Sequence, residues 1–358
     1  MRITDITWRK CRIALTEPFK IAFASVDYTE NVLLKVTTDE SLTGYGEAAP
    51  FAPVTGETAD SVIAALQLLK PGLIGVDPFR IEYIHALMNK ALYGNHSAKC
   101  AVDLAMYDLM GKAAGQPVYK LLGGYQPQVQ NDITIAINTP EKMAAMAKQR
   151  AETDGFHILK IKAGINPDED IRAIELIRKT VGDQVRLRVD ANQGYDVASA
   201  LYAIDGFKRY GVEAVEQCLP YWDIEGAQIL HAKVSGIKLM MDESVHTEKD
   251  AFRLIKNRCA DILNIKLMKC GGLLPGAKIS DIAESAGVSC MVGCMLETKI
   301  AITAGLSLVA ARRNITEADC DSFMFYQDSD TGMSGGFVRK QDKFVLLDEP
   351  GFGIHFSF

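Results

Sequence analysis

Short apolar segments alternate with amphipathic segments over residues 131–321, a pattern typical of strands that are each followed by a helix. In the intervening segments 170–182 and 250–259, apolar residues recur at helical spacing. Polar residues end successive apolar segments at positions 162, 190, 216, 242, 266 and 294, so these ends are 24 to 28 residues apart. One strand–helix unit has this length, and the pattern therefore predicts a (β/α)8-type barrel. The expected strands span 131–138, 157–164, 184–192, 214–219, 237–244, 260–269, 289–297 and 317–321.

The residues on either side of this repeat have a different pattern. Residues 1–50 alternate apolar and polar positions around a turn at 38–41, which predicts antiparallel strands. Residues 323–358 contain short strand patterns and Gly-rich turns, so we expect this tail to pack on the first domain and the last strand to lack an ordinary helix. Three helices are expected between the first strands and the barrel, at 58–69, 78–92 and 97–114, the last with Ser97 as its N-cap.

The composition fits a folded protein in a reducing compartment. Charged residues make up 23% of the 358 residues, the formal net charge is −6, and no basic cluster is present, which argues against a nucleic-acid partner. The first residues lack the apolar core of a signal peptide, and no apolar run reaches membrane-spanning length. The eight cysteines are isolated, and several lie inside apolar segments. We therefore predict a cytoplasmic enzyme with neither a nucleic-acid nor a membrane partner.

Three successive strands of the predicted barrel end in carboxylates: Asp190, Glu216 and Asp242. The carboxyl ends of barrel strands gather at one mouth, where barrel enzymes place their chemistry. Three converging carboxylates repel each other unless a cation lies between them, and hard oxygen ligands at this density suit Mg²⁺. The alternative is that each carboxylate caps the following helix, which fits one or two of them better than three consecutive strands.

Lys160 and Lys162 lie at the end of the strand before Asp190. Side chains alternate along a strand, so both ammonium groups project from the same face. Two adjacent like charges lower each other's pKa, which makes one lysine a candidate base near neutral pH. The alternative is an edge strand that holds both lysines in water.

A third lysine, Lys266, ends a strand on the opposite side of the predicted barrel, with the three carboxylate strands between. It shares a face with Asn264, whereas we expect Lys269 on the other face. A metal flanked by two lysines suits removal of a proton from a carbon next to a carboxylate, through an enediolate, and return of a proton on the opposite face. Such chemistry inverts a stereocentre. The alternative is a structural ion pair between Lys266 and Asp242 or Glu243.

These residues resemble the enolase superfamily, in its muconate-lactonising subgroup. The resemblance covers essentially the whole chain, and it implies an α/β fold: a (β/α)7β TIM-like barrel at 126–322 with an α+β capping domain built from 1–125 and the C-terminal segment 323–358. The motifs that carry it are LKIK at 159–162, VDAN at 189–192, VEQ at 215–217, MDES at 241–244 and NIKLMKCGG at 264–272, together with LLGG at 121–124 and PGFGI at 350–354.

The resemblance also implies roles for these residues. Lys162 and Lys266 are expected to be the acid/base pair, on either side of a bound Mg²⁺. The remaining assignments are Asp190, Glu216 and Asp242 as metal ligands, with Lys160, Asn192 and Glu243 as supporting residues behind them.

Within the subgroup, the chain looks most like the dipeptide epimerases, especially the L-Ala-D/L-Glu epimerases. The segments CMVGCMLETK at 290–299 and VTGE at 54–57 carry this likeness, as do Asp319 and Asp321 around Cys320. In that family the paired aspartates bind the free ammonium group of the dipeptide, whose C-terminal residue is inverted at Cα. Two carboxylates opposite a metal-bound carboxylate would select a zwitterion of fixed length. The alternative is a cap pair at a strand end.

One departure from the family concerns the side chain of the inverted residue. The similar Ala-Glu enzymes carry an arginine in the first capping loop, where this chain has Ala24, and Lys20 is the only basic residue of the loop. We therefore expect a small or hydrophobic second residue in the dipeptide. The other expected pocket residues are Phe19, Ile21, Phe23, Phe51 and Val54 in the lid and Thr134, Cys294 and Met295 in the barrel.

Three other functions compete with dipeptide epimerisation. An N-acylamino acid racemase or an o-succinylbenzoate synthase would use the same chemistry, but those substrates lack the ammonium group that Asp319 and Asp321 are expected to bind. A Schiff-base aldolase would leave the three carboxylates unexplained. A non-catalytic barrel is disfavoured because the set of mouth residues is complete. We also expect a homo-oligomer.

Overall fold

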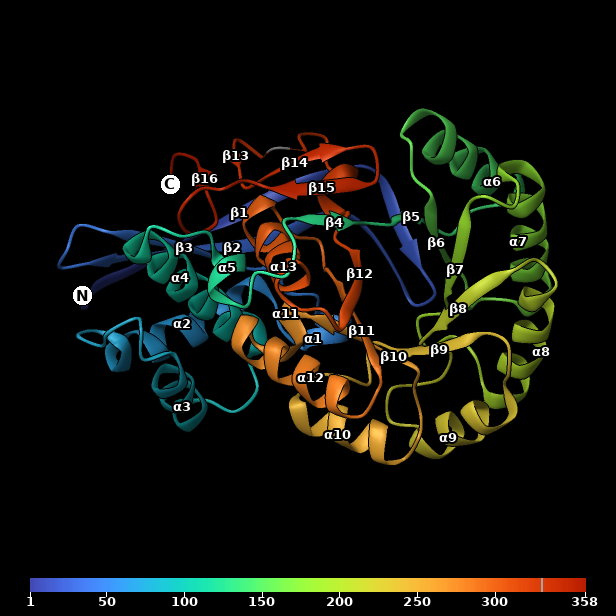
Figure 1. Ribbon diagram of the computed structural model, residues 1–358, viewed down its shortest axis with the longest axis horizontal. Helices are drawn as coiled ribbons and strands as arrows, with labels where there is room; N and C mark the ends of the chain where they lie inside the picture. The colour runs from blue at the N-terminus through green and yellow to red at the C-terminus, as the bar shows by residue number, and fades with distance from the viewer. Residues whose placement is uncertain (330) are drawn as a thin grey trace.

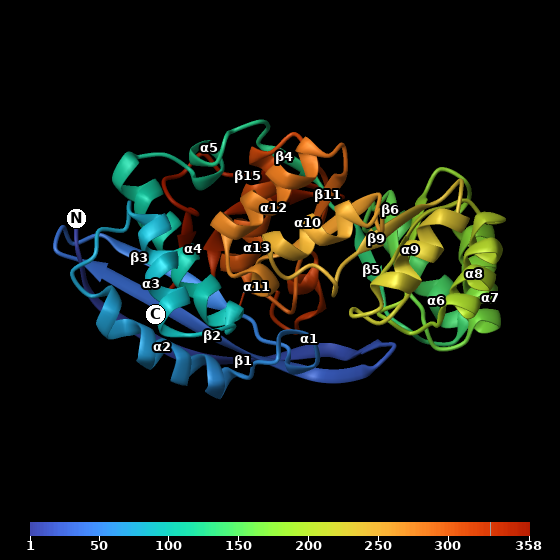
Figure 2. The same cartoon turned by 90° about the horizontal axis from the view of Figure 1, so that it is seen from below.

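The structure is a computed structural model that describes residues 1–329 and 331–358. It begins with a three-stranded antiparallel sheet of β1 (Ile3–Ile21), β2 (Ala24–Thr38) and β3 (Thr43–Ala48). Helices pack on one face of this sheet, as Figures 1 and 2 show. Helices α2 (Ala59–Leu73) and α4 (His96–Ala114) contact the sheet, and α3 (Ile81–Ala91) packs against both; the short helices α1 (Ala52–Thr55) and α5 (Val118–Leu121) follow β3 and α4 in the chain.

Alternate residues of β2 bury their side chains against these helices, as the period of two requires; Val32, Leu34 and Val36 are all buried. The two glycines of β3, Gly44 and Gly46, let the strand lie directly against α4. A Cβ at either position would overlap a carbonyl oxygen of that helix. This close packing explains why β3 carries glycine where a strand would otherwise favour a β-branched residue.

Eight parallel strands follow in the order of the sequence, β5 next to β6 and so on to β12. Asn131, just before β5, forms a bridge with Ala318 of β12, which brings the two edges of the sheet together. A 3-10 helix, η2 (Ser322–Phe325), follows β12 in place of an eighth helix. The strands are β5 (Ile133–Ile135), β6 (Ile158–Lys162), β7 (Arg186–Asp190), β8 (Val212–Glu216), β9 (Lys238–Met241), β10 (Ile262–Lys266), β11 (Ser289–Gly293) and β12 (Ile315–Asp319).

Helices cover the outside of these strands and bury an apolar face against them (Figure 1). For example, Ile174 and Ile177 of α7 join Leu159 and Ile161 of β6 in one apolar cluster. The fold is therefore the predicted TIM-like (β/α)7β barrel with a separate α+β domain. The outer helices are α6 (Pro140–Lys148), with a π-helical turn η1 (Gln149–Thr153), α7 (Pro167–Val181), α8 (Val197–Lys208), α9 (Ile224–Lys233), α10 (Glu248–Lys256), α12 (Leu273–Ser285) and α13 (Lys299–Ala311). The short helix α11 (Leu267–Cys270) follows β10, is buried and packs against α4.

The C-terminal segment contributes β13 (Ser334–Gly335), β14 (Phe337–Lys340), β15 (Lys343–Leu346) and β16 (Ile354–His355). β15 pairs with β14 and with β4 (Gln128–Gln130), which precedes the barrel. Farther along, Val118 donates a backbone hydrogen bond to Gly351, and the ring of Phe356 packs on Tyr45 of β3. The division of the chain at residues 125 and 322 stays a prediction.

Buried carboxylates of the N-terminal part cap helices of the barrel. Glu47 of β3 accepts hydrogen bonds from the backbone N–H groups of Thr298 and Ala301, at the start of α13. Asp103 of α4 accepts from those of Leu273 and Leu274, at the start of α12. The first N–H groups of a helix have no partner within the helix, so these bonds fix the N-terminal domain on the barrel.

Several boundaries differ from those predicted. Helix α2 continues through Pro71, and α3 begins only at Ile81. Ser97 is not an N-cap: α4 starts one residue earlier after Asn95, and the Ser97 N–H is bound by the buried Glu57. A carboxylate distant in sequence therefore replaces the local cap. Over 1–329 and 331–358, no helix combines the length and the apolarity needed to cross a membrane.

Candidate active site

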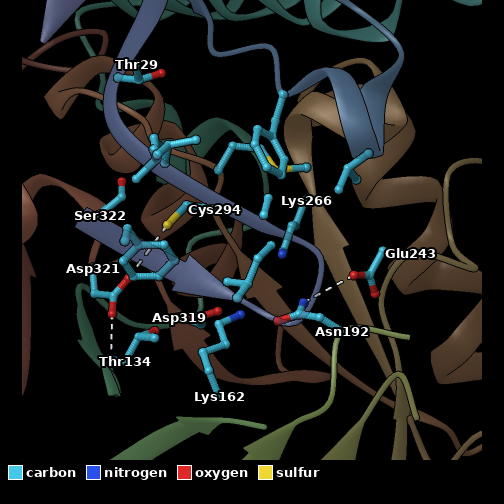
Figure 3. Close-up of a pocket in the computed structure, with 18 of the residues that line it drawn as sticks. Thr29, Thr134, Lys162, Asn192, Glu243, Lys266, Cys294, Asp319, Asp321 and Ser322 are labelled. Atoms are coloured by element: carbon cyan, nitrogen blue, oxygen red, sulfur yellow. Dashed lines mark hydrogen bonds between the residues drawn. The ribbon is translucent and has the colours of Figure 1, made fainter. Parts of the chain in front are cut away.

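A cavity that is partly open to solvent lies at the carboxyl ends of the barrel strands beneath the β1–β2 hairpin. Its walls come from the hairpin, from the segment around α1 and from seven of the barrel strands or the loops after them (Figure 3). All eight residues predicted to contact substrate line it: Phe19, Ala24, Phe51, Thr134, Cys294, Met295, Asp319 and Asp321. Lys162, Lys266, Asn192 and Glu243 line it as well.

Asp190, Glu216 and Asp242 converge next to this cavity, in contact with its lining residues Lys162 and Lys266. One carboxylate oxygen from each lies within 4.8 Å of an oxygen of the other two, and all three side chains are buried. Strand register brings the first two together, because Asp190 of β7 lies opposite Glu216 of β8. Burial, followed by the neighbouring Asp190 charge, raises the pKa of Glu216 to about 7.

The three carboxylates fit a divalent cation. They offer hard, anionic oxygen donors at one point, and they are too deeply buried for water to screen their repulsion. Their geometry is not that of three independent helix caps, since their oxygens face one another rather than three separate helix starts. Lysine ammonium groups supply part of the balancing positive charge in this structure.

Lys162 and Lys266 approach the carboxylates from different strands. The Lys162 Nζ lies 2.6 Å from Asp190 Oδ2, and the Lys266 Nζ lies 2.7 Å from Asp242 Oδ2. The strands β6 and β10 are four positions apart in the eight-stranded order, with β7, β8 and β9 between them. Two strands so related lie on opposite sides of a closed barrel. Both side chains point into the cavity in Figure 3.

Lys160 lies behind Lys162 and is almost fully buried, with a 1% exposed side chain. Its ammonium group contacts three carboxylates: Asp190 at 3.1 Å, Glu216 at 2.8 Å and Asp319 at 2.8 Å. The sequence suggested that Lys160 and Lys162 lower each other's pKa. Instead, although burial lowers it, the charges of these carboxylates dominate and raise the pKa of Lys160 well above its usual value.

Lys269 is placed differently from the sequence-based expectation. The strand β10 ends at Lys266, and Lys269 belongs to the short helix α11 that follows. The change from strand to helix turns Lys269 inward, where its ammonium group binds both the carboxylate and the carbonyl oxygen of Asp242. Burial opposes ionisation, but Lys266 and Lys269 together lower the pKa of Asp242 well below its usual value.

Asn192 and Glu243 form a pair beside the carboxylates. The Asn192 Nδ2 donates to Glu243 Oε1 at 3.2 Å, and the backbone N–H of Asn192 donates to Asp190. Asn192 Oδ1 and Glu243 Oε2 are buried and have no hydrogen-bond partner among the described residues. Both residues line the cavity, so the pair keeps unused polar atoms beside the space that a ligand would enter.

Asp319 and Asp321 form the opposite polar end of the cavity. The Asp319 carboxylate forms an ion pair with Lys160, and Asp321 Oδ2 accepts a hydrogen bond from the backbone N–H of Thr134 at 2.7 Å. Burial and the nearby Asp319 charge raise the pKa of Asp321 to about 6. The side chains of Asp319 and Asp321 both face the cavity in Figure 3, with Thr134 beside Asp321.

The roof of the cavity is apolar. At the hairpin tip, Ile21 of β1 pairs with Ala24 of β2 and Phe19 pairs with Val26, and these four side chains line the cavity together with Phe23. Lys20 alternates with Phe19 and Ile21 and is exposed on the other face. The ring of Phe23 lies 6.4 Å from that of Phe51, which closes the roof above α1.

Sequence reasoning missed several wall residues. Strand alternation past Ala24 could have identified Val26. Ser322 directly follows the polar residues Asp319 and Asp321 at the end of the last barrel strand, and this position could have identified it. Thr29 and Leu296 had no local signal, because they reach the cavity only through the packing of β2 on the loop before α13. The missed lining residues are Val26, Thr29, Pro50, Leu296 and Ser322.

Comparison with known proteins agrees with this geometry. Residues 3–123 match the model of the mandelate racemase / muconate lactonizing enzyme N-terminal domain, and residues 142–357 match that of the enolase C-terminal domain-like family. The chain is 41% identical to an L-Ala-D/L-Glu epimerase from Clostridium acetobutylicum, with 99% of each chain covered. It is 42% identical to a hydrophobic dipeptide epimerase from Enterococcus faecalis, again over 99% of each.

A solved structure is similarly close. It is a dipeptide epimerase from Enterococcus faecalis complexed with Mg and the dipeptide L-Leu-L-Tyr, with a TM-score of 0.96, 40% identity and 99% of each chain covered. Together with the barrel, the domain above it and the charged mouth, these matches show that the chain belongs to the mandelate racemase / muconate lactonizing enzyme family of the enolase superfamily.

Proposed function

We propose that the protein is a Mg²⁺-dependent isomerase that inverts the Cα of the C-terminal residue of a dipeptide. The observation that carries this proposal is the pairing of two polar ends in one cavity. Asp319 and Asp321 lie at one end, and the lysines beside the carboxylate trio lie at the other. A dipeptide zwitterion has an ammonium group and a carboxylate at its two ends, so it complements this layout.

The relatives support the same reaction class. The curated relatives at about 40% identity are epimerases, and the solved relative holds both Mg and a dipeptide. We assign the cation to Asp190, Glu216 and Asp242, supported by Lys160, Asn192 and Glu243. When bound there, Mg²⁺ would supply positive charge for a substrate carboxylate.

Lys162 and Lys266 provide the proton transfers of the proposed mechanism. They lie on opposite walls, so a substrate Cα between them would have one amine on each face. One lysine, neutral at that moment, takes the α-proton, and the ammonium group of the other donates a proton to the opposite face. The product has the opposite configuration, and the two lysines have exchanged protonation states. The same pair can therefore catalyse the reverse reaction with the roles of base and acid exchanged.

The two-lysine mechanism predicts a distinctive phenotype for Lys162→Ala and Lys266→Ala. Each change removes one proton carrier, so epimerisation should fall by at least about 100-fold. The remaining lysine should still exchange the α-proton of one enantiomer, and the two variants should differ in which one. Proton NMR in D₂O with each stereoisomer measures both rates.

Lys278→Ala serves as the control for the lysine variants, because Lys278 lies on the surface and pairs only with Glu82 in the described contacts. It should leave both rates unchanged. Full turnover in both cavity variants would rule out the two-lysine mechanism.

The alternative function is that of an N-acylamino acid racemase or an o-succinylbenzoate synthase of the same subgroup. Its substrates carry no ammonium group, so the paired aspartates would have no partner in them. The buried position of Asp319 and Asp321 supports the dipeptide, because the Lys160 ammonium group is shared with other carboxylates and a further cation would offset the cost of burying this pair.

Replacement of Asp321 separates the two functions. Asp321→Asn keeps the shape and the bond from Thr134 but removes a charge-assisted contact, so kcat/KM for a dipeptide should fall by about 10- to 100-fold. Turnover of an N-succinyl amino acid should not fall. If the unmodified protein prefers the N-succinyl substrate, the alternative function is the correct one.

The apolar roof supports a small or hydrophobic second residue in the dipeptide. The hairpin presents Phe19, Ile21 and Phe23, and Ala24 takes the place at which the similar Ala-Glu enzymes carry an arginine. A glutamate side chain would lose its hydration beneath this roof without gaining a cationic partner.

Kinetics with an L-Ala-L-Xaa library test this preference. Small and hydrophobic Xaa residues should give the highest kcat/KM, and Ala24→Arg should shift the preference toward Xaa = Glu by about tenfold or more. Ala24→Leu is the size control and should not produce that shift. A strong preference of the unmodified protein for Xaa = Glu would overturn the argument.

We also propose a cytoplasmic location, since all eight cysteines are free and most are buried. The homo-oligomeric state expected from the sequence stays a prediction.

A further inference from the structure

A third carboxylate lies behind the pair at the ammonium end of the cavity. Asp132 stands immediately before β5, and its backbone N–H donates to Ala318 of β12 at 3.0 Å. One carboxylate oxygen from each of Asp132, Asp319 and Asp321 lies within 4.8 Å of the other two. Asp132 is 0% exposed and does not line the cavity, whereas the other two do.

The hydrogen bonds of Asp132 are incomplete. Its Oδ2 accepts from Arg188 Nη1 at 3.1 Å, but its Oδ1 has no partner among the described residues. A buried carboxylate oxygen without a partner is uncommon, because its desolvation is then uncompensated. The described side chains therefore leave this carboxylate cluster incompletely satisfied.

The cluster also has too little positive charge around it. Arg188 also forms an ion pair with Glu317, and Lys160 also forms ion pairs with Asp190 and Glu216 of the proposed metal site. Three carboxyls thus depend on two cations that are already engaged elsewhere. Consistent with this deficit, burial and the Asp319 charge raise the pKa of Asp132 well above its usual value.

We propose that Asp132 is a third carboxyl of the ammonium site, a positioning residue that acts through Asp319 and Asp321 to favour a substrate with a charged amino terminus. The inference rests on the proposed function, in which the aspartate pair binds that ammonium group. The incoming ammonium supplies the cation that the cluster lacks and thereby favours the ionised form of Asp132, whose carboxylate then strengthens the attraction without touching the ammonium group. Neutral acyl groups gain nothing from this charge, so Asp132 determines specificity rather than chemistry.

The variant Asp132→Asn tests the proposal with two ligands. One is L-Ala-L-Leu, and the other is N-propanoyl-L-leucine, which differs only by the absent ammonium group. For the dipeptide, KM should rise by about tenfold with kcat nearly unchanged. For the acyl analogue, measured as a substrate or as a competitive inhibitor, the affinity should stay within about twofold.

Asp342→Asn is the matched control, because Asp342 is also a buried acid but binds Gln130 and His157 away from the cavity. It should leave the ratio between the two ligands unchanged. If Asp132→Asn is insoluble, Asp132→Ser gives the same comparison with a smaller side chain and a hydroxyl left for Arg188.

Each outcome separates this inference from the function on which it rests. An unchanged dipeptide KM in the Asp132 variant, or an equal loss for both ligands, would overturn the role of Asp132 alone. A wild-type protein that binds N-propanoyl-L-leucine as well as L-Ala-L-Leu would overturn the ammonium site itself.

Discussion

The buried ammonium group of Lys160 connects the two polar ends of the cavity. It touches Asp190 and Glu216 on one side and Asp319 on the other, so one charge is shared between the carboxylate trio and the aspartate pair. A buried charge is tolerated only when it is well paired, and here the pairing joins four strands, β6, β7, β8 and β12. The separation of the two ends is therefore built into the barrel, and in the proposed function it would set the length of the ligand that fits.

The N-terminal domain depends on similar electrostatics at helix ends. Glu47 and Asp103 bind the starts of α13 and α12, which places the β1–β2 hairpin over the barrel mouth. In the proposed function, the barrel would supply charge and proton transfer, whereas the hairpin supplies an apolar roof. This division would allow the roof residues to change specificity without disturbing the charges of the barrel, as expected for function carried on loops over a rigid scaffold.

The regular spacing of polar strand ends was sufficient to predict the barrel and to bring Lys162, Asp190 and Glu216 together, because register follows directly from parallel pairing. Asp132 could not be predicted in this way. It precedes its strand, and only the stagger between β5 and β12 raises it to the level of Asp319. The predicted orientation of Lys269 was wrong because strand alternation does not extend past the start of α11. The predicted N-cap at Ser97 was wrong because a carboxylate distant in sequence binds the start of that helix.

Divalent-cation binding tests the central claim most directly. Isothermal titration of the metal-free protein with Mg²⁺ should show one site per chain, and Glu216→Gln, which removes one charge from the trio, should weaken it by at least about tenfold. Asp60→Asn, at an exposed surface carboxylate, should leave the affinity unchanged. Absence of Mg²⁺ binding by the unmodified protein, or equal binding by the Glu216 variant, would contradict the account.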